Sequence, residues 1–301
     1  MRECLKMPDT NRKSDVALIV ANFNNGRFLH EFFQSVLRSQ LIPEQICFVD
    51  DGSTDESLKI AESYREKLLN CNCDLNIVSF GKNRGFGYAL NEAIDLCRTT
   101  YSARIDPDDR LYPQRLSRQV GFMKLNPEVS VLGSNIAYFH SDTGASLRSS
   151  NVPVGKTEIN RQLQKGCIPV IHGSSIFKTE VLKSFKYRPD TVPAEDYDLF
   201  SRVLSAGSVI ENISEVLTEV RIHDKSVSNS LPITTIEKTF RLREENMSIP
   251  YRRSTVLRRY LHQKYYRRYL YTNGVIRYLY LFIAALCWPD SVRRNIGKVN
   301  A

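Results

Sequence analysis

Paired cysteines, a long apolar segment and a secretory leader are all missing from this sequence, and each absence excludes a class of protein. The seven cysteines are scattered, and Cys71 and Cys73 have no second pair to complete a zinc-site spacing. The uncharged run at 278–289 is shorter than the ~20 residues that span a bilayer. Residues 1–13 are polar, unlike a signal peptide. These features predict a cytoplasmic protein with reduced thiols.

Negative charge is scarce only in the last quarter of the chain. The 301-residue sequence carries a net charge of +9, with 42 Lys and Arg against 33 Asp and Glu. From residue 231 onward there are 14 basic and 4 acidic residues, so this region alone carries +10. The preceding residues are close to neutral, with 28 basic and 29 acidic residues. This change in composition predicts two domains, at 14–229 and 230–301.

Apolar strands and amphipathic helices alternate along the neutral region. Residues 16–21 form an uninterrupted apolar run, typical of a strand that is buried on both faces. Further strands are expected at 46–49, 75–80, 101–105, 129–139, 173–177 and 208–222, with helices at 27–39, 55–69, 87–98, 158–165 and 196–206. Such alternation predicts an α/β fold with a mostly parallel central sheet flanked by helices. Open sheets of this kind bind ligands at the carboxyl ends of their strands.

A pair of aspartates follows the strand at 46–49, in the segment FVDDGSTDES. Ser53 and Glu56 have the spacing of a capping box for the next helix. That role does not explain Asp50 and Asp51, which precede the cap at the end of the strand. Two carboxylates at this position suit hydrogen bonding to a polar ligand, such as the imide N–H of uracil or a ribose hydroxyl.

A loop with two glycines, KNRGFGYALNEAI, precedes the helix expected at 87–98. The free N–H groups of a helix N-terminus favour anions. The loop lacks the third glycine of the dinucleotide-binding fingerprint, which argues against a nicotinamide cofactor. Two interpretations of Arg84 stay open: it faces a phosphate group, or it is an ordinary surface arginine.

Three carboxylates, Asp106, Asp108 and Asp109, lie within four positions in the segment RIDPDDRLYPQRL. A solvated turn stiffened by Pro107 is the structural explanation. The alternative is a site for a hard cation, because closely spaced carboxylates bind Mg²⁺ or Mn²⁺ together with phosphate oxygens and water. A bound cation would cancel the repulsion between the three side chains.

Five motifs in this order resemble those of the family 2 glycosyltransferases, which have the GT-A nucleotide-sugar-binding fold. The resemblance covers about residues 14–229 and depends on VDDGSTD (49–55), NRGFGYALN (83–91), DPDDRLYPQRL (106–116), EDYDLFSRVL (195–204) and RIHDKSVS (221–228). It implies a metal-dependent, inverting transfer of a hexosyl or acetylhexosaminyl group, in bacterial surface-polysaccharide assembly. The sequence departs from the family at Pro107, where alanine is usual, but the carboxylates are kept.

The resemblance also implies roles for individual residues. Residues implied to bind the nucleotide-sugar are Asn22, Asp51, Arg84, Asp106 and Asp109. Asp108 and His223 are implied to contact a Mn²⁺ or Mg²⁺ ion. Asp196 matches the catalytic base, which takes a proton from the acceptor hydroxyl, and His172 lies where residues on the acceptor side are expected. UDP-sugars are the preferred donors, with guanosine and thymidine donors left open, and the acceptor is expected to be a glycan or a lipid-linked saccharide.

Arginine pairs alternate with aromatic residues in the basic region, as in YRRSTVLRRYLHQKYYRRYLY (251–271). Basic residues beside Tyr, Leu and Trp suit a helix on an anionic membrane, so residues 252–294 are a candidate peripheral contact with the inner face of the cell membrane. One alternative is a helical subdomain that packs on the catalytic domain and keeps its arginines in water. A nucleic-acid surface would carry similar charge and is the least favoured of the three.

Two other functions compete with sugar transfer. A sugar-phosphate nucleotidyltransferase would carry a G-x-G-T-R-L-type loop after the first strand, and NFNNGRF (22–28) does not fit it. The other is a non-catalytic binding module, either a degenerate transferase or a nucleic-acid binder that uses its tail. The presence of Asp106, Asp108 and Asp196 argues against degeneracy.

Overall fold

The computed structural model describes residues 14–222 and 232–289, which fall into two compact units. The first unit extends to residue 226 and the second begins at residue 227, in a stretch outside the described residues. The first unit contains the sheet and, within the described residues, four of the five motifs that point to a nucleotide-sugar. The second unit contains the basic and aromatic region.

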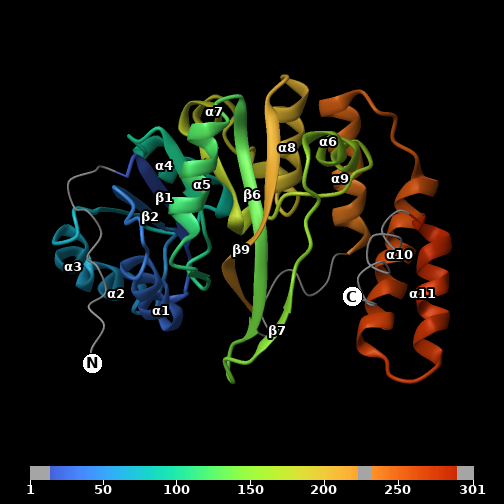
Figure 1. Ribbon diagram of the computed structural model, residues 1–301, viewed down its shortest axis with the longest axis horizontal. Helices are drawn as coiled ribbons and strands as arrows, with labels where there is room; N and C mark the ends of the chain where they lie inside the picture. The colour runs from blue at the N-terminus through green and yellow to red at the C-terminus, as the bar shows by residue number, and fades with distance from the viewer. Residues whose placement is uncertain (1–13, 223–231, 290–301) are drawn as a thin grey trace. The chain divides into compact units, whose positions relative to one another are not determined.

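A nine-stranded mixed sheet forms the centre of the first unit (Figure 1). Its strands are β1 Val16–Asn22, β2 Gln45–Asp50, β3 Asp74–Ser79, β4 Tyr101–Arg104, β5 Arg110–Leu111, β6 Val129–His140, β7 Ser146–Ser149, β8 Ile176–Lys178 and β9 Val209–Ile222. They lie in the order β3-β2-β1-β4-β8-β6-β9-β5, and β7 pairs with β6. The strands from β3 to β4 are parallel, β8 runs antiparallel to both neighbours, and β6 and β9 are parallel. The predicted mostly parallel α/β sheet is therefore confirmed.

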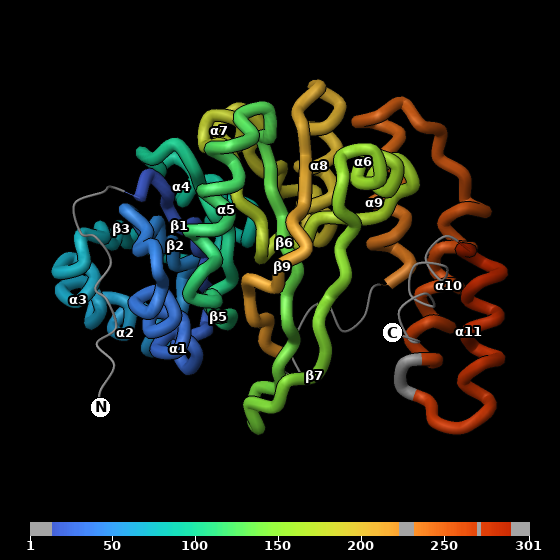
Figure 2. Tube along the Cα trace, in the orientation of Figure 1, coloured from blue at the N-terminus to red at the C-terminus, as the bar shows by residue number. Residues whose placement is uncertain are grey.

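Two short strands were not predicted, and both lack an apolar pattern. β5 has two residues, and all four residues of β7 are exposed. Each forms because it pairs with a long strand: β5 with β9, and β7 with the distal part of β6. In Figure 2 the trace of β6 and β7 forms a hairpin that extends beyond the neighbouring strands.

Helices cover both faces of this sheet (Figure 1). Their bounds are α1 Gly26–Leu37, α2 Ser57–Ser63, α3 Arg65–Leu69, α4 Phe86–Leu96, α5 Arg115–Leu125, α6 Lys156–Gln164, α7 Thr179–Phe185 and α8 Glu195–Ser205, with 3₁₀ turns at His172–Ser174 and Pro189–Thr191. The helix expected at 55–69 is divided at Tyr64, whose ring stacks on Phe33 with 4.7 Å between ring centroids. This packing anchors the break against the apolar core under β1 and β2.

The predicted capping box is wrong, because its residues hold a neighbouring loop instead. α2 begins at Ser57, and the Asp55 carboxylate accepts the backbone N–H groups of Ser57 (3.0 Å) and Gly26 (2.8 Å). The Ser53 hydroxyl accepts the N–H of Asn24 at 2.8 Å. The loops after β1 and β2 are therefore hydrogen-bonded to each other, which fixes the carboxyl edge of the sheet.

Three helices make up the described part of the second unit: α9 Ile233–Met247, α10 Arg253–Tyr271 and α11 Ile276–Cys287. Ile236, Phe240 and Val256 form a small core between α9 and α10. The buried His262 ring of α10 donates a hydrogen bond to the Ala284 carbonyl of α11 at 2.9 Å, and burial lowers the pKa of His262 to about 4. Among the described residues, no helix has both the length and the apolar character to cross a bilayer.

Replacement of Asp198 by asparagine should destabilise the fold. Asp198 is fully buried on α8 and pairs with Arg188 and Arg202, which tie α8 to the segment before it. Breaking a buried ion pair costs about 3–5 kcal/mol, and we expect the lower end because both arginines keep some solvent contact. Urea unfolding followed by circular dichroism measures the change.

The matched control for this variant is Glu215→Gln, which removes an exposed ion pair with Arg118. Such surface pairs contribute about 0–1 kcal/mol. Equal unfolding free energies for the two variants would contradict a structural role for Asp198.

Candidate functional site

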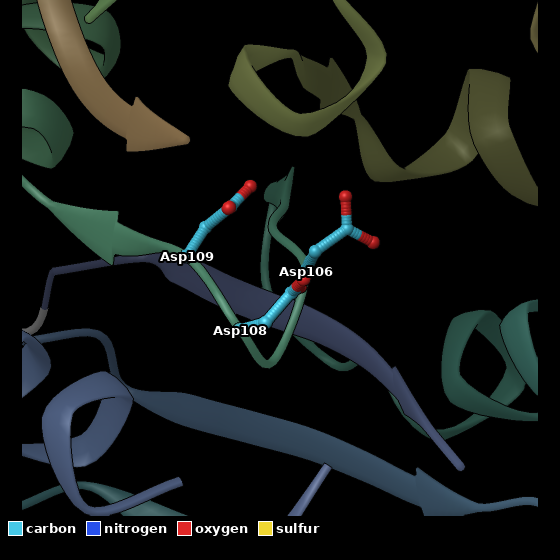
Figure 3. A group of neighbouring side chains, drawn as sticks. All are labelled: Asp106, Asp108 and Asp109. Atoms are coloured by element: carbon cyan, nitrogen blue, oxygen red, sulfur yellow. The ribbon is translucent and has the colours of Figure 1, made fainter. Parts of the chain in front are cut away.

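The acidic cluster lies in the loop between β4 and β5, at the carboxyl edge of the sheet. One carboxylate oxygen from each of Asp106, Asp108 and Asp109 lies within 4.8 Å of the other two. Figure 3 shows the three side chains leaving one tight loop and pointing toward the same side. Across residues 14–222 and 232–289 no other group of three or more potential metal ligands comes so close together.

A buried arginine lies directly beneath this cluster. Arg104 ends β4, is only 5% exposed, and donates from both terminal nitrogens to both carboxylate oxygens of Asp106. The fully buried Arg115 donates to the Arg104 carbonyl at 2.7 Å, and burial lowers the pKa of Arg115 to about 9. Both side chains therefore carry positive charge at neutral pH. They offset part of the repulsion between the three carboxylates.

The other end of the acidic loop is held by β9. The Asp109 carboxylate accepts the backbone N–H of Arg221 at 2.9 Å, and the Arg221 side chain donates to the Asp108 carbonyl at 2.9 Å. Burial, together with the negative charges of Asp108 and Asp106, raises the pKa of Asp109 well above its usual range. Burial also raises the pKa of Asp106, although Arg104 opposes this rise.

These residues fit a divalent cation. Hard carboxylate oxygens that converge within a few ångströms are the ligands that Mg²⁺ and Mn²⁺ prefer. A bound cation would also favour the ionised forms of Asp106 and Asp109, against the effect of burial.

Asp51 holds the glycine loop at the end of β2. Its two carboxylate oxygens accept the backbone N–H groups of Arg84 (2.6 Å) and Gly85 (2.9 Å). Gly52 follows with φ +77°, and a Cβ there would lie 2.5 Å from the carbonyl carbon of Lys82, so only glycine fits. The exposed Arg84 guanidinium lies 4.5 Å from the centre of the Phe80 ring.

Asn22 and Asp50 lie deeper, between the loops after β1 and β2. Both are fully buried, and the Asn22 amide donates to Asp50 at 2.7 Å. The other oxygen of Asp50 accepts the N–H of Ser53 at 2.8 Å, so Asp50 has a structural role. The buried Asn22 Oδ1 accepts no hydrogen bond from the part of the chain that the structure describes.

Glu195 and Asp196 are the first two residues of α8. Asp196 Oδ1 accepts the N–H of Tyr197 at 2.6 Å, and burial raises the pKa of Asp196. Burial, and then the charge of Asp196, raises the pKa of Glu195 to about 7. The positive charge of Arg104 partly opposes the rise of both pKa values.

A close backbone contact sets the position of α8. A Cβ on Gly87, in the first turn of α4, would lie 2.9 Å from the Cα of Pro189, in the turn that precedes α8. The second glycine of GFG is therefore needed for packing between α4 and this turn. The glycine loop, held by Asp51, and the α8 N-terminus are thus positioned against each other.

The hydrogen-bonded side chains of His172 and Tyr187 form the aromatic part of the site. His172 Nε2 lies 2.6 Å from the Tyr187 hydroxyl, and burial lowers the pKa of His172 well below its usual range. His172 is therefore neutral at pH 7. A Cβ on the neighbouring Gly173 would lie 3.0 Å from Arg104 Nη1, which puts this turn against the acidic cluster.

Part of the predicted site adjoins Arg104. Phe86 of the glycine loop lies 5.4 Å from its guanidinium, Asp106 binds it directly, and Asp196 is within its electrostatic reach. His223 lies outside the described residues. The roles of these side chains toward a ligand stay predictions.

Sequence reasoning missed the three buried arginines of the site, Arg104, Arg115 and Arg221. The role of Arg104 could have been inferred from the sequence, because an arginine that ends a buried strand requires a charged partner. Arg115 and Arg221 carry no comparable clue. Their partners lie 11 and 113 residues away along the chain.

Comparisons with known proteins agree with this geometry. A model of glycosyl transferase family 2 matches residues 17–185. The amylovoran biosynthesis glycosyltransferase AmsE of Erwinia amylovora is 31% identical over 206 residues, which cover 68% of this chain and 75% of the relative. The UDP-Gal:alpha-D-GlcNAc-diphosphoundecaprenol beta-1,3-galactosyltransferase of Escherichia coli is 27% identical over 217 residues, 71% of this chain and 76% of the relative.

The solved structures show the fold. The crystal structure of S. aureus TarS 1–349 in complex with UDP-GlcNAc matches with a TM-score of 0.63 at 17% identity, over 92% of this chain and 82% of that one. The fold is GT-A, as the motifs predict. The family match covers more than half of the sequence, and this chain belongs to glycosyl transferase family 2.

Proposed function

We propose that this glycosyltransferase moves a sugar from a nucleotide-sugar to an acceptor hydroxyl with inversion, and that it requires a divalent cation. The observation that carries the proposal is the convergence of the Asp106, Asp108 and Asp109 carboxylates, whose oxygens lie within 4.8 Å of one another at the carboxyl edge of the sheet. A transfer of this kind needs carboxylates for a cation at the diphosphate and a separate carboxylate for the acceptor, for which Asp196 is the candidate.

The donor is a UDP-sugar, which carries a hexosyl or acetylhexosaminyl group. The E. coli relative is named for UDP-Gal, and the TarS structure contains UDP-GlcNAc. A second structural neighbour, a mannosyltransferase from Pyrobaculum calidifontis, contains GDP-Man and Mn²⁺. The residues that we assign to the nucleotide-sugar are Asn22, Asp51, Arg84, Asp106 and Asp109.

Asp108 is the side chain that we assign to Mn²⁺ or Mg²⁺, with Asp106 and Asp109 beside it. When bound, the cation stabilises the negative charge that develops on the leaving diphosphate. His223 is a further candidate ligand from the sequence. Arg104 and Arg221 hold the loop that would carry the cation.

Asp196 acts as the base. Its Oδ1 is held by the N–H of Tyr197, which leaves Oδ2 to accept the proton of the acceptor hydroxyl. As that oxygen bonds to the anomeric carbon, the bond from the anomeric carbon to the diphosphate oxygen breaks, and its electron pair leaves with the diphosphate. Attack from the face opposite the leaving group inverts the anomeric configuration. The neutral His172 borders this site without adding charge.

The acceptor is a glycan or a lipid-linked saccharide in cell-surface polysaccharide synthesis. The names of the relatives support this class, since one serves amylovoran biosynthesis and another acts on a diphosphoundecaprenol-linked sugar. We assign catalysis to a domain at residues 14–229, and contact with the acceptor's membrane to residues 252–294 of a second domain at 230–301.

An apolar stripe on α11 supports the membrane contact. Val275, Leu279, Phe282 and Leu286 are spaced along one helix face, and each is between 54% and 86% exposed. Residues 253–287 contain seven Lys and Arg and no Asp or Glu. An exposed apolar face beside positive charge suits the surface of an anionic leaflet.

Donor hydrolysis tests the reaction. We expect slow, Mn²⁺-dependent release of nucleoside diphosphate from one member of a panel of UDP-, GDP- and dTDP-sugars, with water as the acceptor. Asp108→Asn should lower this release by about 10²-fold or more, because the leaving diphosphate loses its cation. Asp142→Asn, a change at an exposed turn, is the control. Pyrophosphate release from a nucleoside triphosphate and a sugar phosphate would support a nucleotidyltransferase instead.

Asp196→Asn should lower donor hydrolysis by about 10²–10⁴-fold and leave nucleotide affinity unchanged, because it removes only the base. In the wild type, the rate should fall as pH decreases, since protonated Asp196 accepts no proton. Burial raises the pKa of Asp196, so this loss should occur above the ordinary aspartate value of about 3.9. A variant that retains wild-type rates would remove Asp196 from the mechanism.

The double variant Leu279→Ser/Phe282→Ser should reduce binding to phosphatidylcholine–phosphatidylglycerol vesicles by about 10-fold or more, as each buried apolar side chain contributes about 1.5–3 kcal/mol. Vesicle flotation measures the fraction of protein bound to the vesicles. Leu69→Ser/Leu125→Ser removes equally exposed leucines from the first unit and should have no effect. Wild-type protein that floats with neither anionic nor neutral vesicles would contradict the membrane contact.

A further inference from the structure

Arg221 lies near the end of β9 and contacts the acidic loop twice. Its backbone N–H donates to the Asp109 carboxylate and its Nε to the Asp108 carbonyl, both at 2.9 Å. Its Nη2 donates to Glu31 on α1 at 2.8 Å. The side chain is only 3% exposed, so these bonds form in a largely water-excluded environment.

Two aromatic rings hold the Arg221 guanidinium between them. Its central carbon lies 4.6 Å from the centre of the Phe28 ring on α1 and 4.5 Å from that of Phe139 on β6. Three elements thus fix one planar group at the base of the loop. A lysine keeps the charge but cannot reproduce either the stacking or the forked hydrogen bonds.

We propose that Arg221 is the positioning residue of the cation site, which fixes the Asp108–Asp109 backbone and the Asp109 carboxylate so that the cluster binds a divalent cation. This inference rests on the proposed cation site and goes beyond it, because Arg221 itself bears no ligand atom. Residues that orient metal ligands typically change metal affinity by 10–100-fold when they are replaced.

Two glutamates offer a matched test of this role. Glu31 and Glu219 both pair with Arg110, at 3.4 and 3.2 Å. Only Glu31 also pairs with Arg221. Replacing either glutamate by glutamine removes one negative charge beside Arg110, but only Glu31→Gln removes an anchor of Arg221.

Mn²⁺ titration of the full chain, followed by the electron paramagnetic resonance of free Mn²⁺, is the measurement, with and without UDP. Arg221→Lys should weaken Mn²⁺ binding by about 10-fold or more, and Glu31→Gln by several-fold. Glu219→Gln should bind Mn²⁺ like the wild type. Equal affinities for the Glu31 and Glu219 variants, or wild-type affinity in Arg221→Lys, would overturn the inference.

Two controls distinguish failure of the positioning role from failure of the cation site itself and from loss of the fold. Asp108→Asn should bind Mn²⁺ poorly; if the wild type itself binds none, the proposed cation site fails and Arg221 has nothing to position. Thermal unfolding of each variant identifies loss of fold. A purely structural Arg221 would lower the unfolding temperature of Arg221→Lys and leave the Mn²⁺ affinity of the folded protein unchanged, which contradicts a positioning role.

Discussion

Attraction between buried arginines and crowded carboxylates is the interaction on which this site depends. Three aspartates in one short loop repel one another, and burial adds to the cost of their charge. Arg104 pairs with Asp106 from below, and Arg221 holds the backbone and the carboxylate at the other end of the loop. Without these two arginine side chains the loop would have to open toward water, and the three carboxylates would no longer converge.

The same arrangement links the carboxyl edge of the sheet to the α8 helix. Asp51 and Gly52 fasten the glycine loop to the end of β2, and Gly87 lets Pro189 approach α4 closely. Each contact joins parts of the chain that are distant in sequence through backbone atoms. Backbone contacts of this kind leave little freedom for side-chain adjustment, so the site is held by the fold and not by a ligand.

Electrostatics differ between the two sides of Arg104. On the side of the acidic loop, burial favours protonated carboxylates, which a divalent cation would reverse. At the start of α8, burial raises the pKa of Asp196, and the positive charge of Arg104 opposes this rise.

The sequence by itself determined the family, the sheet and the acidic cluster, because each depends on local information. Apolar runs specify buried strands, and the motif order places Asp51, Asp106 and Asp196 at strand or helix ends. The tertiary structure alone decided which arginines hold the acidic loop, since Arg115 donates to the Arg104 carbonyl and Arg221 to the Asp108 carbonyl through long-range packing. It also bonded Ser53 to the loop after β1 instead of the helix start, and Asp55 to both that loop and the first residue of α2. Hydrogen bonds between residues that are distant in sequence produce no periodic pattern in the sequence, because only the folded backbone brings the donor and the acceptor together.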